Sequence, residues 1–216
     1  MKIHALYTRL GAEGLIVGNS GNVSIRAAHG MTISPSGGDP DGVGAKDFSR
    51  LTLDGEALNK ATPSSEWEMH AAIYRSFPDA HCVVHAHSDA CTALASLHLA
   101  LPPFHYNVLA FGGADVRCAP YVTFGTKELA DLAVTALMDR SACLLANHGM
   151  ILYGRDPKHA LGQARILEAL CRQYLLARAA GKPVLLTPDQ IAQARERFKS
   201  YGPRGGKAAS TAASTD

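Results

Sequence analysis

Residues 142–154 read ACLLANHGMILYG, and residues 81–87 read HCVVHAH; these two stretches decide the fold. Both are rich in apolar side chains, and the second is too short and too rich in valine for a buried helix. We therefore expect residues 81–87 to form a buried strand. The longer stretch predicts two extended pieces joined at His148-Gly149.

Outward from these strands, apolar spacing and helix-start residues predict further helices. They are expected at about 2–17, 63–78, 89–97, 126–139, 157–180 and 188–199. The first helix would place four apolar side chains on one side: Ile3, Ala5, Leu6 and Leu10.

Glycine-rich turns bound three further segments that are expected to contain strands, at residues 19–26, 31–38 and 49–58. The last of them leads into a turn at Asp54-Gly55. Residues 102–125 are rich in Gly and Pro, so we expect irregular structure with short strands near Val116 and Tyr121. Strands that alternate with helices predict a mixed α/β layer architecture.

Composition excludes several classes of protein. The chain has 216 residues, 47% of them hydrophobic and 19% charged, which suits one globular domain. A net charge of +2 is too balanced to predict a nucleic-acid or membrane-surface partner. No apolar run reaches the roughly 18 residues of a membrane span, and the polar N-terminus does not resemble a signal peptide.

Five cysteines, an odd number, argue against a complete disulfide framework and favour a reduced, cytoplasmic protein. Residues 205–216, GGKAASTAASTD, have no large apolar side chain. We expect them to form a flexible tail after a single domain at residues 1–204.

Ten histidines stand out in this composition. On a strand, His85 and His87 would face the same side, about 6.6 Å apart at their Cα atoms. Two such imidazoles can converge on a metal ion, and His148 is the best candidate for a third ligand. The alternative is that they are ordinary hydrogen-bonded histidines. Five others are expected to be structural: His4, His29, His81, His98 and His159.

Two further patterns permit either a structural or a functional interpretation. In Pro63-Ser64-Ser65-Glu66-Trp67-Glu68, a capping box formed by Ser65 and Glu68 is the simpler interpretation. The same helix start could instead bind an anion. The glycines of 18–26 and 31–38 are typical of turns, although such loops can also hold an anion. No nucleotide-binding fingerprint is present in the sequence.

Seven motifs in order resemble the class II aldolase/adducin family, most closely its L-fuculose-1-phosphate aldolase branch. They are GNVSIR, ISPSG, SSEWEMHAAIY, VVHAHS, HYNVLAFGGADVRCAPYVTFGTKEL, NHGMILYG and FKSYG, and the resemblance spans about residues 3–203. It implies a three-layer α/β/α fold with a mainly antiparallel central sheet flanked by helices. It also implies a homotetramer with active sites between subunits.

The resemblance implies a zinc site, with Mn²⁺ or Co²⁺ as alternatives, on His85, His87 and His148. Glu66 would be a fourth ligand that moves away to act as the catalytic acid/base. Tyr106 would reach the aldehyde oxygen from a neighbouring subunit. The resemblance implies that the substrate phosphate is bound by Asn19, Asn22, Ser36, Gly37, Ser64 and Ser65. It also implies that Phe124 and Tyr201 shape the aldehyde end of the site.

The implied reaction is cleavage of a ketose 1-phosphate into dihydroxyacetone phosphate and an aldehyde, through an enediolate that the metal stabilises. L-fuculose 1-phosphate, 5-deoxyribulose 1-phosphate and 5-(methylthio)ribulose 1-phosphate are the candidate substrates, the last two for a salvage enzyme. A pentulose-5-phosphate 4-epimerase, a sugar-acid phosphate decarboxylase and a non-enzymatic adducin-like module are the alternatives.

The chain departs from the family pattern at a few positions. Asn19 and Ser36 stand where threonines are typical, and both keep the ability to form hydrogen bonds. Asn147 stands where a histidine often precedes the third metal ligand. After Tyr201 the sequence diverges, which leaves the aldehyde specificity open.

Overall fold

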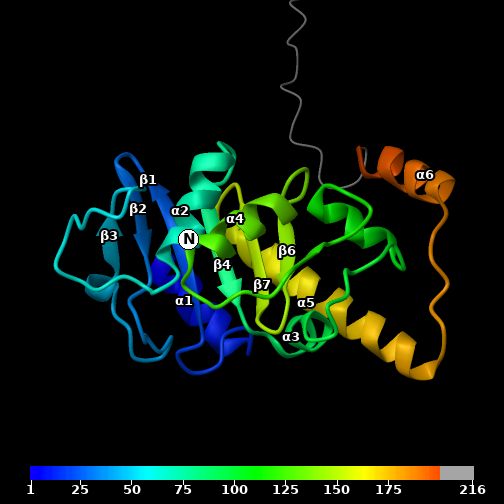
Figure 1. Cartoon of the computed structure of the whole chain (residues 1–216), viewed down its shortest axis with the longest axis horizontal. Coiled ribbons are helices and arrows are strands. Elements are labelled where there is room, and N and C mark those ends of the chain that lie inside the picture. The colour runs from blue at the N-terminus through cyan, green and yellow to red at the C-terminus, as the bar shows by residue number, and fades with distance from the viewer. Residues whose placement is uncertain (200–216) are drawn as a thin grey trace, which may run out of the picture.

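The computed structural model describes residues 1–199, in which one central sheet is sandwiched between two layers of helices (Figure 1). Within this range the sheet has seven strands in the order β3-β2-β1-β4-β7-β6-β5. The strands are β1 (Gly21–Ala27), β2 (Gly30–Ile33), β3 (Ser49–Leu51), β4 (Cys82–Ala86), β5 (Cys118–Ala119), β6 (Ala142–Leu145) and β7 (Gly149–Gly154). All neighbours are antiparallel except β5 and β6. The expected mainly antiparallel α/β/α fold is confirmed.

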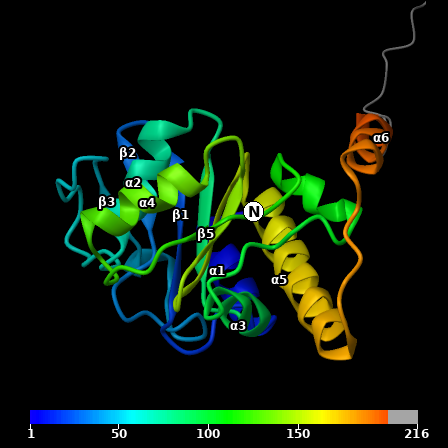
Figure 2. The ribbon, with the colours of Figure 1, turned by 45° about the vertical axis from the view of Figure 1, so that its right-hand side comes forward.

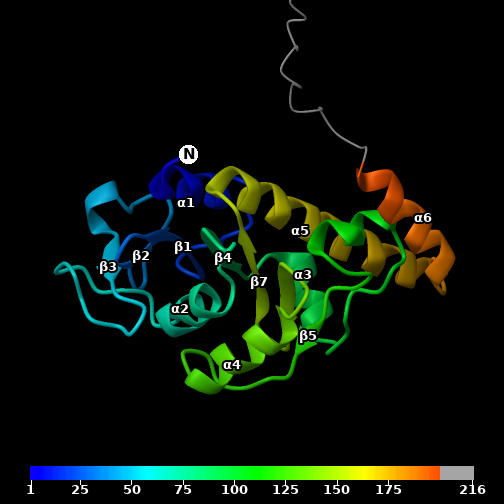
Figure 3. The same cartoon turned by 90° about the horizontal axis from the view of Figure 1, so that it is seen from above.

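The helices cover both faces of the sheet, as the view from above shows (Figure 3). One face carries α1 (Ile3–Ala12), α3 (Asp89–Ala95) and α5 (Pro157–Ala180), and the other carries α2 (Trp67–Ser76) and α4 (Lys127–Ala136). The last described helix, α6 (Pro188–Lys199), lies away from the sheet beside the 3₁₀ helix η2 (Tyr106–Phe111) (Figure 2). A second 3₁₀ helix, η1 (Ala45–Asp47), precedes β3. No described helix is both long and apolar enough to cross a membrane.

Alternating side chains on the central strands fill two separate cores. Val84 of β4 packs with the layer of α1, α3 and α5, whereas Val83 packs with α2 and α4. Leu144 and Leu145 of β6 divide in the same way. Both faces are covered, so these strands read as continuous apolar runs, as the sequence predicted.

Several expected boundaries are wrong, and local contacts explain them. The first helix ends at Ala12 rather than at residue 17, because Gly14 adopts a left-handed conformation (φ 69°) and the amide of Leu15 closes back onto the carbonyl of Leu10. Ala5, expected on its apolar side, is exposed.

The capping box expected at Ser65 and Glu68 is not formed. Residue 63 pairs with Pro35 in an antiparallel bridge, and the Ser64 amide donates to the carbonyl of Ser34 (3.1 Å). This pairing keeps the segment extended, so α2 begins only at Trp67, with Glu66 at its N-cap and no side-chain cap.

The segment 102–125 is less irregular than expected, because it contains η2. Val116 pairs with Leu101 in an isolated bridge, but the short strand forms at Cys118–Ala119 and not at Tyr121. Tyr201 and the expected tail at 205–216 lie outside the described residues, so the division at residue 204 stays a prediction.

Candidate metal centre and substrate site

The candidate metal ligands meet where three central strands of the sheet begin or end. Because β1, β4 and β7 are successive antiparallel neighbours, the end of β4 lies beside the starts of β1 and β7. His85 faces Asn22 across the β1–β4 pair, and Ala86 faces Met150 across the β4–β7 pair. His87 directly follows β4, and His148 directly precedes β7.

Gly149 makes this arrangement possible through a close approach of two backbones. A Cβ atom at residue 149 would lie 2.4 Å from the carbonyl oxygen of Ala86. Only glycine fits there, so the expectation of a close backbone contact beside His148 is confirmed.

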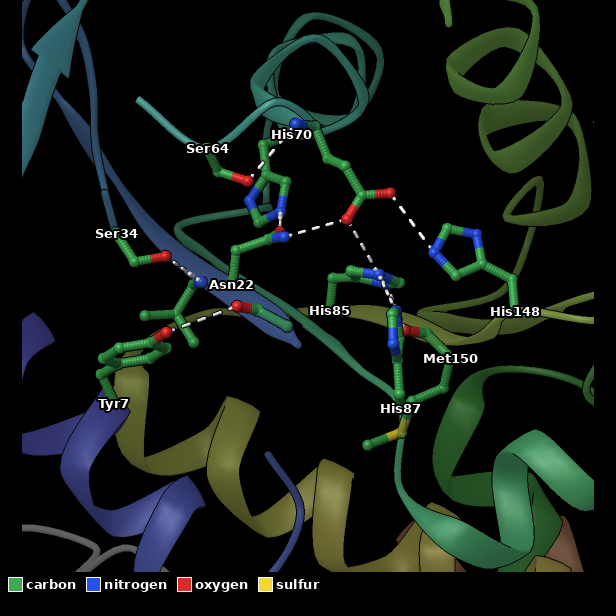
Figure 4. Close-up of polar contacts among 12 residues, drawn as sticks. Tyr7, Asn22, Ser34, Ser64, His70, His85, His87, His148 and Met150 are labelled. Carbon is green, nitrogen blue, oxygen red and sulfur yellow. Dashed lines mark hydrogen bonds and ion pairs between the residues drawn. The ribbon is translucent and has the colours of Figure 1, made fainter. Parts of the chain in front are cut away.

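The three histidines point toward one another (Figure 4). Glu66, at the N-cap of α2, joins them. The three ring centroids are 4.8 Å apart in every pair, and the rings are tilted by 68–79°. One nitrogen or oxygen of each residue lies within 4.8 Å of the corresponding atoms of the other three. We call Glu66, His85, His87 and His148 the Glu–His cluster.

Nε2 of His85 faces the other members of the Glu–His cluster, where it could bind a cation. Nδ1 of His85 lies 2.8 Å from the carbonyl oxygen of Met150, which can only accept, so Nδ1 carries a hydrogen. Its Nε2 lies 3.1 Å from Oε2 of Glu66 and 2.9 Å from Nε2 of His87. A backbone carbonyl that fixes the ring in this way is typical behind a metal-bound histidine.

Glu66 is buried among these groups, and its electrostatics follow from them. Burial raises the pKa of the Glu66 carboxyl, but the charge and hydrogen bond of His85, followed by His148 and Asn22, outweigh burial and lower that pKa below its ordinary range. Oε1 lies 3.4 Å from Nε2 of His148 yet accepts no hydrogen bond from any described residue. A buried carboxylate oxygen without a donor fits a cation as its partner.

His87 and His148 provide lone pairs at neutral pH. Burial, followed by the charge of His85, lowers the pKa of both His87 and His148 to about 4. Burial also acts to lower the pKa of His85, but the Glu66 carboxylate and then the Met150 carbonyl outweigh it and raise that pKa. Three imidazoles and one carboxylate form a donor set that suits zinc and the later first-row metals.

Candidate anion-binding segments lie next to the cluster. Antiparallel pairing of residues 34–36 with residues 62–64 places Ser36 opposite Thr62, whose carbonyl accepts from the Ser36 amide (3.1 Å), and places Ser64 opposite Ser34. Gly37 is exposed and has a φ of 64°, a left-handed conformation that glycine adopts without strain. Ser36 and Gly37, with Ser64 and Ser65 on the paired segment, stay predicted phosphate contacts.

Buried hydrogen bonds connect these two paired segments to β1 and to the Glu–His cluster, and Asn22 of β1 to the cluster. The hydroxyl of Ser34 accepts from the amide of Val23 (3.1 Å), and Nδ2 of Asn22 donates to Oε2 of Glu66 (3.0 Å). The hydroxyl of Ser64 accepts from the Glu66 amide (3.3 Å). Asn19 is exposed in the turn before β1.

Of the three aromatic residues expected near the aldehyde, Phe124 and Tyr106 are described by the structure, and they occupy different places. The loop that carries Phe124 approaches Ser65, because a Cβ on Gly125 would lie 3.2 Å from the Ser65 carbonyl oxygen, and the ring is 63% exposed. Tyr106 is 52% exposed and lines a cavity of about 700 Å³ between η2, α5 and α6. It stacks on His105 at 4.5 Å instead of joining the cluster of its own chain.

Sequence reasoning missed several residues that hold this site in place. Tyr7 of α1 donates to the carbonyl of Gly38 (2.7 Å) and so ties down the candidate phosphate loop. Burial, followed by the charge of Asp39, raises the pKa of Tyr7 to about 12, so the phenol stays a donor. His70 of α2 lies 2.6 Å from Asn22. Its position four residues after Glu66 was the available signal.

Comparisons with known proteins identify the family of the chain. The family described as Class II Aldolase and Adducin N-terminal domain matches residues 1–175. The chain is 41% identical to the 5-methylthioribulose-1-phosphate/5-deoxyribulose-1-phosphate aldolase of Rhodospirillum rubrum, over 88% of this chain and 86% of that one. It is also 41% identical to the L-fuculose phosphate aldolase of Escherichia coli, over 88% and 89%.

A solved L-fuculose 1-phosphate aldolase has a similar structure, with a TM-score of 0.87 and 34% identity. That similarity covers 91% of this chain and 94% of the other. The chain belongs to the class II aldolase and adducin family.

Proposed function

We propose that this chain is a zinc-dependent aldolase that cleaves a ketose 1-phosphate into dihydroxyacetone phosphate and an aldehyde. It is an aldehyde-lyase, as its relatives are by name. The convergence of three histidines and one carboxylate at a single point carries the proposal. The relatives' names supply the substrate class: L-fuculose 1-phosphate, 5-deoxyribulose 1-phosphate or 5-(methylthio)ribulose 1-phosphate.

The Glu–His cluster would hold the metal. When bound, a divalent cation supplies Lewis acidity that stabilises the negative charge left on the substrate as the carbon–carbon bond breaks, an effect of several kcal/mol. The Met150 carbonyl keeps Nε2 of His85 directed at this point. Zinc is the proposed ion because imidazole and carboxylate ligands in a buried site suit it, with Mn²⁺ or Co²⁺ as substitutes.

Glu66 is the proposed acid/base. Its carboxyl group would return a proton to C3 of the cleaved fragment, and it would remove the same proton in the direction of synthesis. Asn22 and His85 hold its Oε2 within hydrogen-bond distance, so the carboxylate starts from a defined position.

The substrate phosphate is proposed to bind to Ser36 and Gly37 together with Ser64 and Ser65, with contributions from Asn19 and Asn22. Anchoring the phosphate would orient C3 toward Glu66.

The aldehyde end is proposed to be completed by a second subunit. Tyr106 is half exposed and lies beside a cavity away from the cluster of its own chain, which suits a residue offered to a neighbour in a homotetramer. It would exchange a proton with the aldehyde oxygen. Phe124 is likewise exposed and would shape the aldehyde site together with Tyr201. All five cysteines are free thiols, which supports a cytoplasmic enzyme.

The test is a panel of ketose 1-phosphates incubated with the enzyme before and after exhaustive chelation, scored by release of dihydroxyacetone phosphate. We expect release only with a divalent metal, and zinc should restore it. Activity that survives chelation contradicts the metal site. An epimerised product without release of dihydroxyacetone phosphate would contradict the proposed aldolase activity and indicate an epimerase.

A matched pair of variants tests the acid/base. Glu66→Gln should lower kcat by at least about 100-fold while zinc stays bound to the three histidines. Glu68→Gln, two residues along the same helix, should have little effect. Equal turnover in the two variants would remove Glu66 from the reaction.

A further inference from the structure

Five buried polar side chains form a continuous line from α2 into the Glu–His cluster. Tyr74 Oη lies 2.8 Å from Ser24 Oγ, which lies 2.7 Å from Nδ1 of His70. Nε2 of His70 lies 2.6 Å from Oδ1 of Asn22, and Nδ2 of Asn22 lies 3.0 Å from Oε2 of Glu66. All five side chains are at most 7% exposed. The proposed reaction leaves Ser24, His70 and Tyr74 without a role.

The direction of the inner hydrogen bonds follows from the carboxylate. An ionised carboxylate only accepts hydrogen bonds, so Asn22 must present its Nδ2 to Glu66. The carbonyl oxygen of Asn22 then faces His70, and Nε2 of His70 must be the donor (Figure 4). The Asn22–Glu66 and Asn22–His70 distances, together with the negative charge of Glu66, therefore determine the orientation of the Asn22 side-chain amide.

The outer hydrogen bonds follow from the neutral imidazole. Burial, followed by the charge of His85, lowers the pKa of His70 to about 3, so the ring carries only one hydrogen at neutral pH. With that hydrogen on Nε2, Nδ1 is an acceptor and must receive the hydroxyl hydrogen of Ser24. Ser24 in turn accepts from the phenol of Tyr74. Every donor in the line points toward the Glu–His cluster.

We propose that Tyr74, Ser24 and His70 form a one-way hydrogen-bond relay that fixes the Asn22 amide with its nitrogen toward the substrate anion. His70 is thus a positioning residue, which acts through Asn22. Nδ2 of Asn22 has two hydrogens and Glu66 takes one, so the other can donate to an oxygen of the bound substrate. The inference deepens the proposed function and relies on it for the identity of that anion.

The relay matters because an asparagine amide can turn over with almost no change in shape. A turned amide would place Oδ1 against the Glu66 carboxylate and Nδ2 against the Nε2 hydrogen of His70. Two buried hydrogen bonds would be lost together, in a place from which solvent is excluded. Without the His70 donor, only the contact with Glu66 would select the productive orientation.

The first experiment measures the His70 tautomer directly. Nitrogen NMR of histidine-labelled protein, with and without zinc, should show Nδ1 without a hydrogen and Nε2 with one. A hydrogen on Nδ1 would overturn the relay. This readout needs no turnover, so it decides the inference even if no ketose 1-phosphate is cleaved and the proposed function fails.

The second experiment compares His70→Gln with His70→Asn. The glutamine amide nitrogen lies about where Nε2 lies and can still donate to Asn22, whereas the shorter asparagine cannot reach it. We expect kcat/KM to be at least tenfold lower for His70→Asn than for His70→Gln, mainly through KM. Both variants should lose similar thermal stability, because both disturb the same buried site.

A control variant separates this effect from the loss of any histidine. His159 of α5 is half-buried, and its Nε2 lies 3.2 Å from the Gln163 amide nitrogen, outside the relay. His159→Asn should keep kcat/KM within about twofold of the unmodified enzyme. Equal losses of kcat/KM in His70→Gln and His70→Asn would reduce His70 to a structural residue and overturn the proposal.

Discussion

The carboxylate of Glu168 in α5 caps the N-terminus of α3. We expect the substitution Glu168→Ala to destabilise the protein by roughly 3 kcal/mol. Its two carboxylate oxygens accept from the amides of Ala90 (2.9 Å) and Cys91 (3.0 Å). Glu168 is 7% exposed, and Ser88 at the N-cap of α3 offers no side-chain cap. Glu168→Ala would leave two buried amides without acceptors, at about 1–3 kcal/mol each. For a chain of this size, this corresponds to a fall in Tm of about 6–12 °C.

The effect should depend on pH in a defined direction. Burial raises the pKa of Glu168, but the amide of Ala90, then the Ser88 hydroxyl and the groups of Cys91, outweigh burial and lower it. The carboxyl pKa is therefore lower in the folded chain than in the unfolded chain, where it is about 4.3. The stabilisation is fully present above about pH 4.3 and is lost as the pH falls through the lowered folded value.

Urea unfolding followed by circular dichroism at one protein concentration measures this effect. Arg172→Gln is the matched control, because Arg172 also contacts Glu168 (3.5 Å) but its side chain is 65% exposed. An exposed ion pair of that kind should contribute less than about 1 kcal/mol. If Glu168→Ala and Arg172→Gln cost the same at pH 7, or if the cost of Glu168→Ala grows toward acid pH, the capping role of Glu168 is refuted.

Three further outcomes are expected. Gly149→Ala should destabilise the protein by at least about 2 kcal/mol in urea unfolding and weaken zinc binding, because the added Cβ would lie 2.4 Å from the Ala86 carbonyl oxygen. Tyr7→Phe should cost about 1 kcal/mol and raise KM for the phosphorylated substrate, since it removes the hydrogen bond to Gly38. Zinc at 100 times its Kd should raise the unfolding free energy by about 2.7 kcal/mol, and calorimetry with and without a chelator measures this change.

The strands were predictable because their signals are local. In β4, Val83 and Val84 fill opposite cores, and the apolar run that results is visible in the sequence. The spacing of His85 and His87 is equally local, so a common direction for their rings could be inferred. His148 lies close to His85 and His87 because β7 pairs with β4. The sequence suggested this pairing only through Gly149, which permits two backbones to approach closely.

Contacts between distant segments explain what the sequence did not predict. Ser65 has the residue type and spacing of a helix cap, but pairing of its neighbours with residues 34–36 delays the helix to Trp67. Nothing near Tyr7 in the chain indicates that its hydroxyl reaches Gly38, 31 residues away. His70 lies within the helix predicted at residues 63–78, but its hydrogen bonds to Ser24 and Asn22 depend on how α2 packs next to β1.

The core of β4 and the Glu–His cluster constrain each other through strand register. His85 lies on the same face of the sheet as Val83, toward α2, and this places its ring next to Glu66. A slip of one residue would turn His85 into the apolar core that Val84 occupies, where an unpaired imidazole is costly to bury. The same slip would move Val84 toward the metal ligands. The apolar pairs that stabilise β4 therefore also set the direction of the first metal ligand, and a variant that loosens this register should lose zinc affinity before it loses its secondary structure.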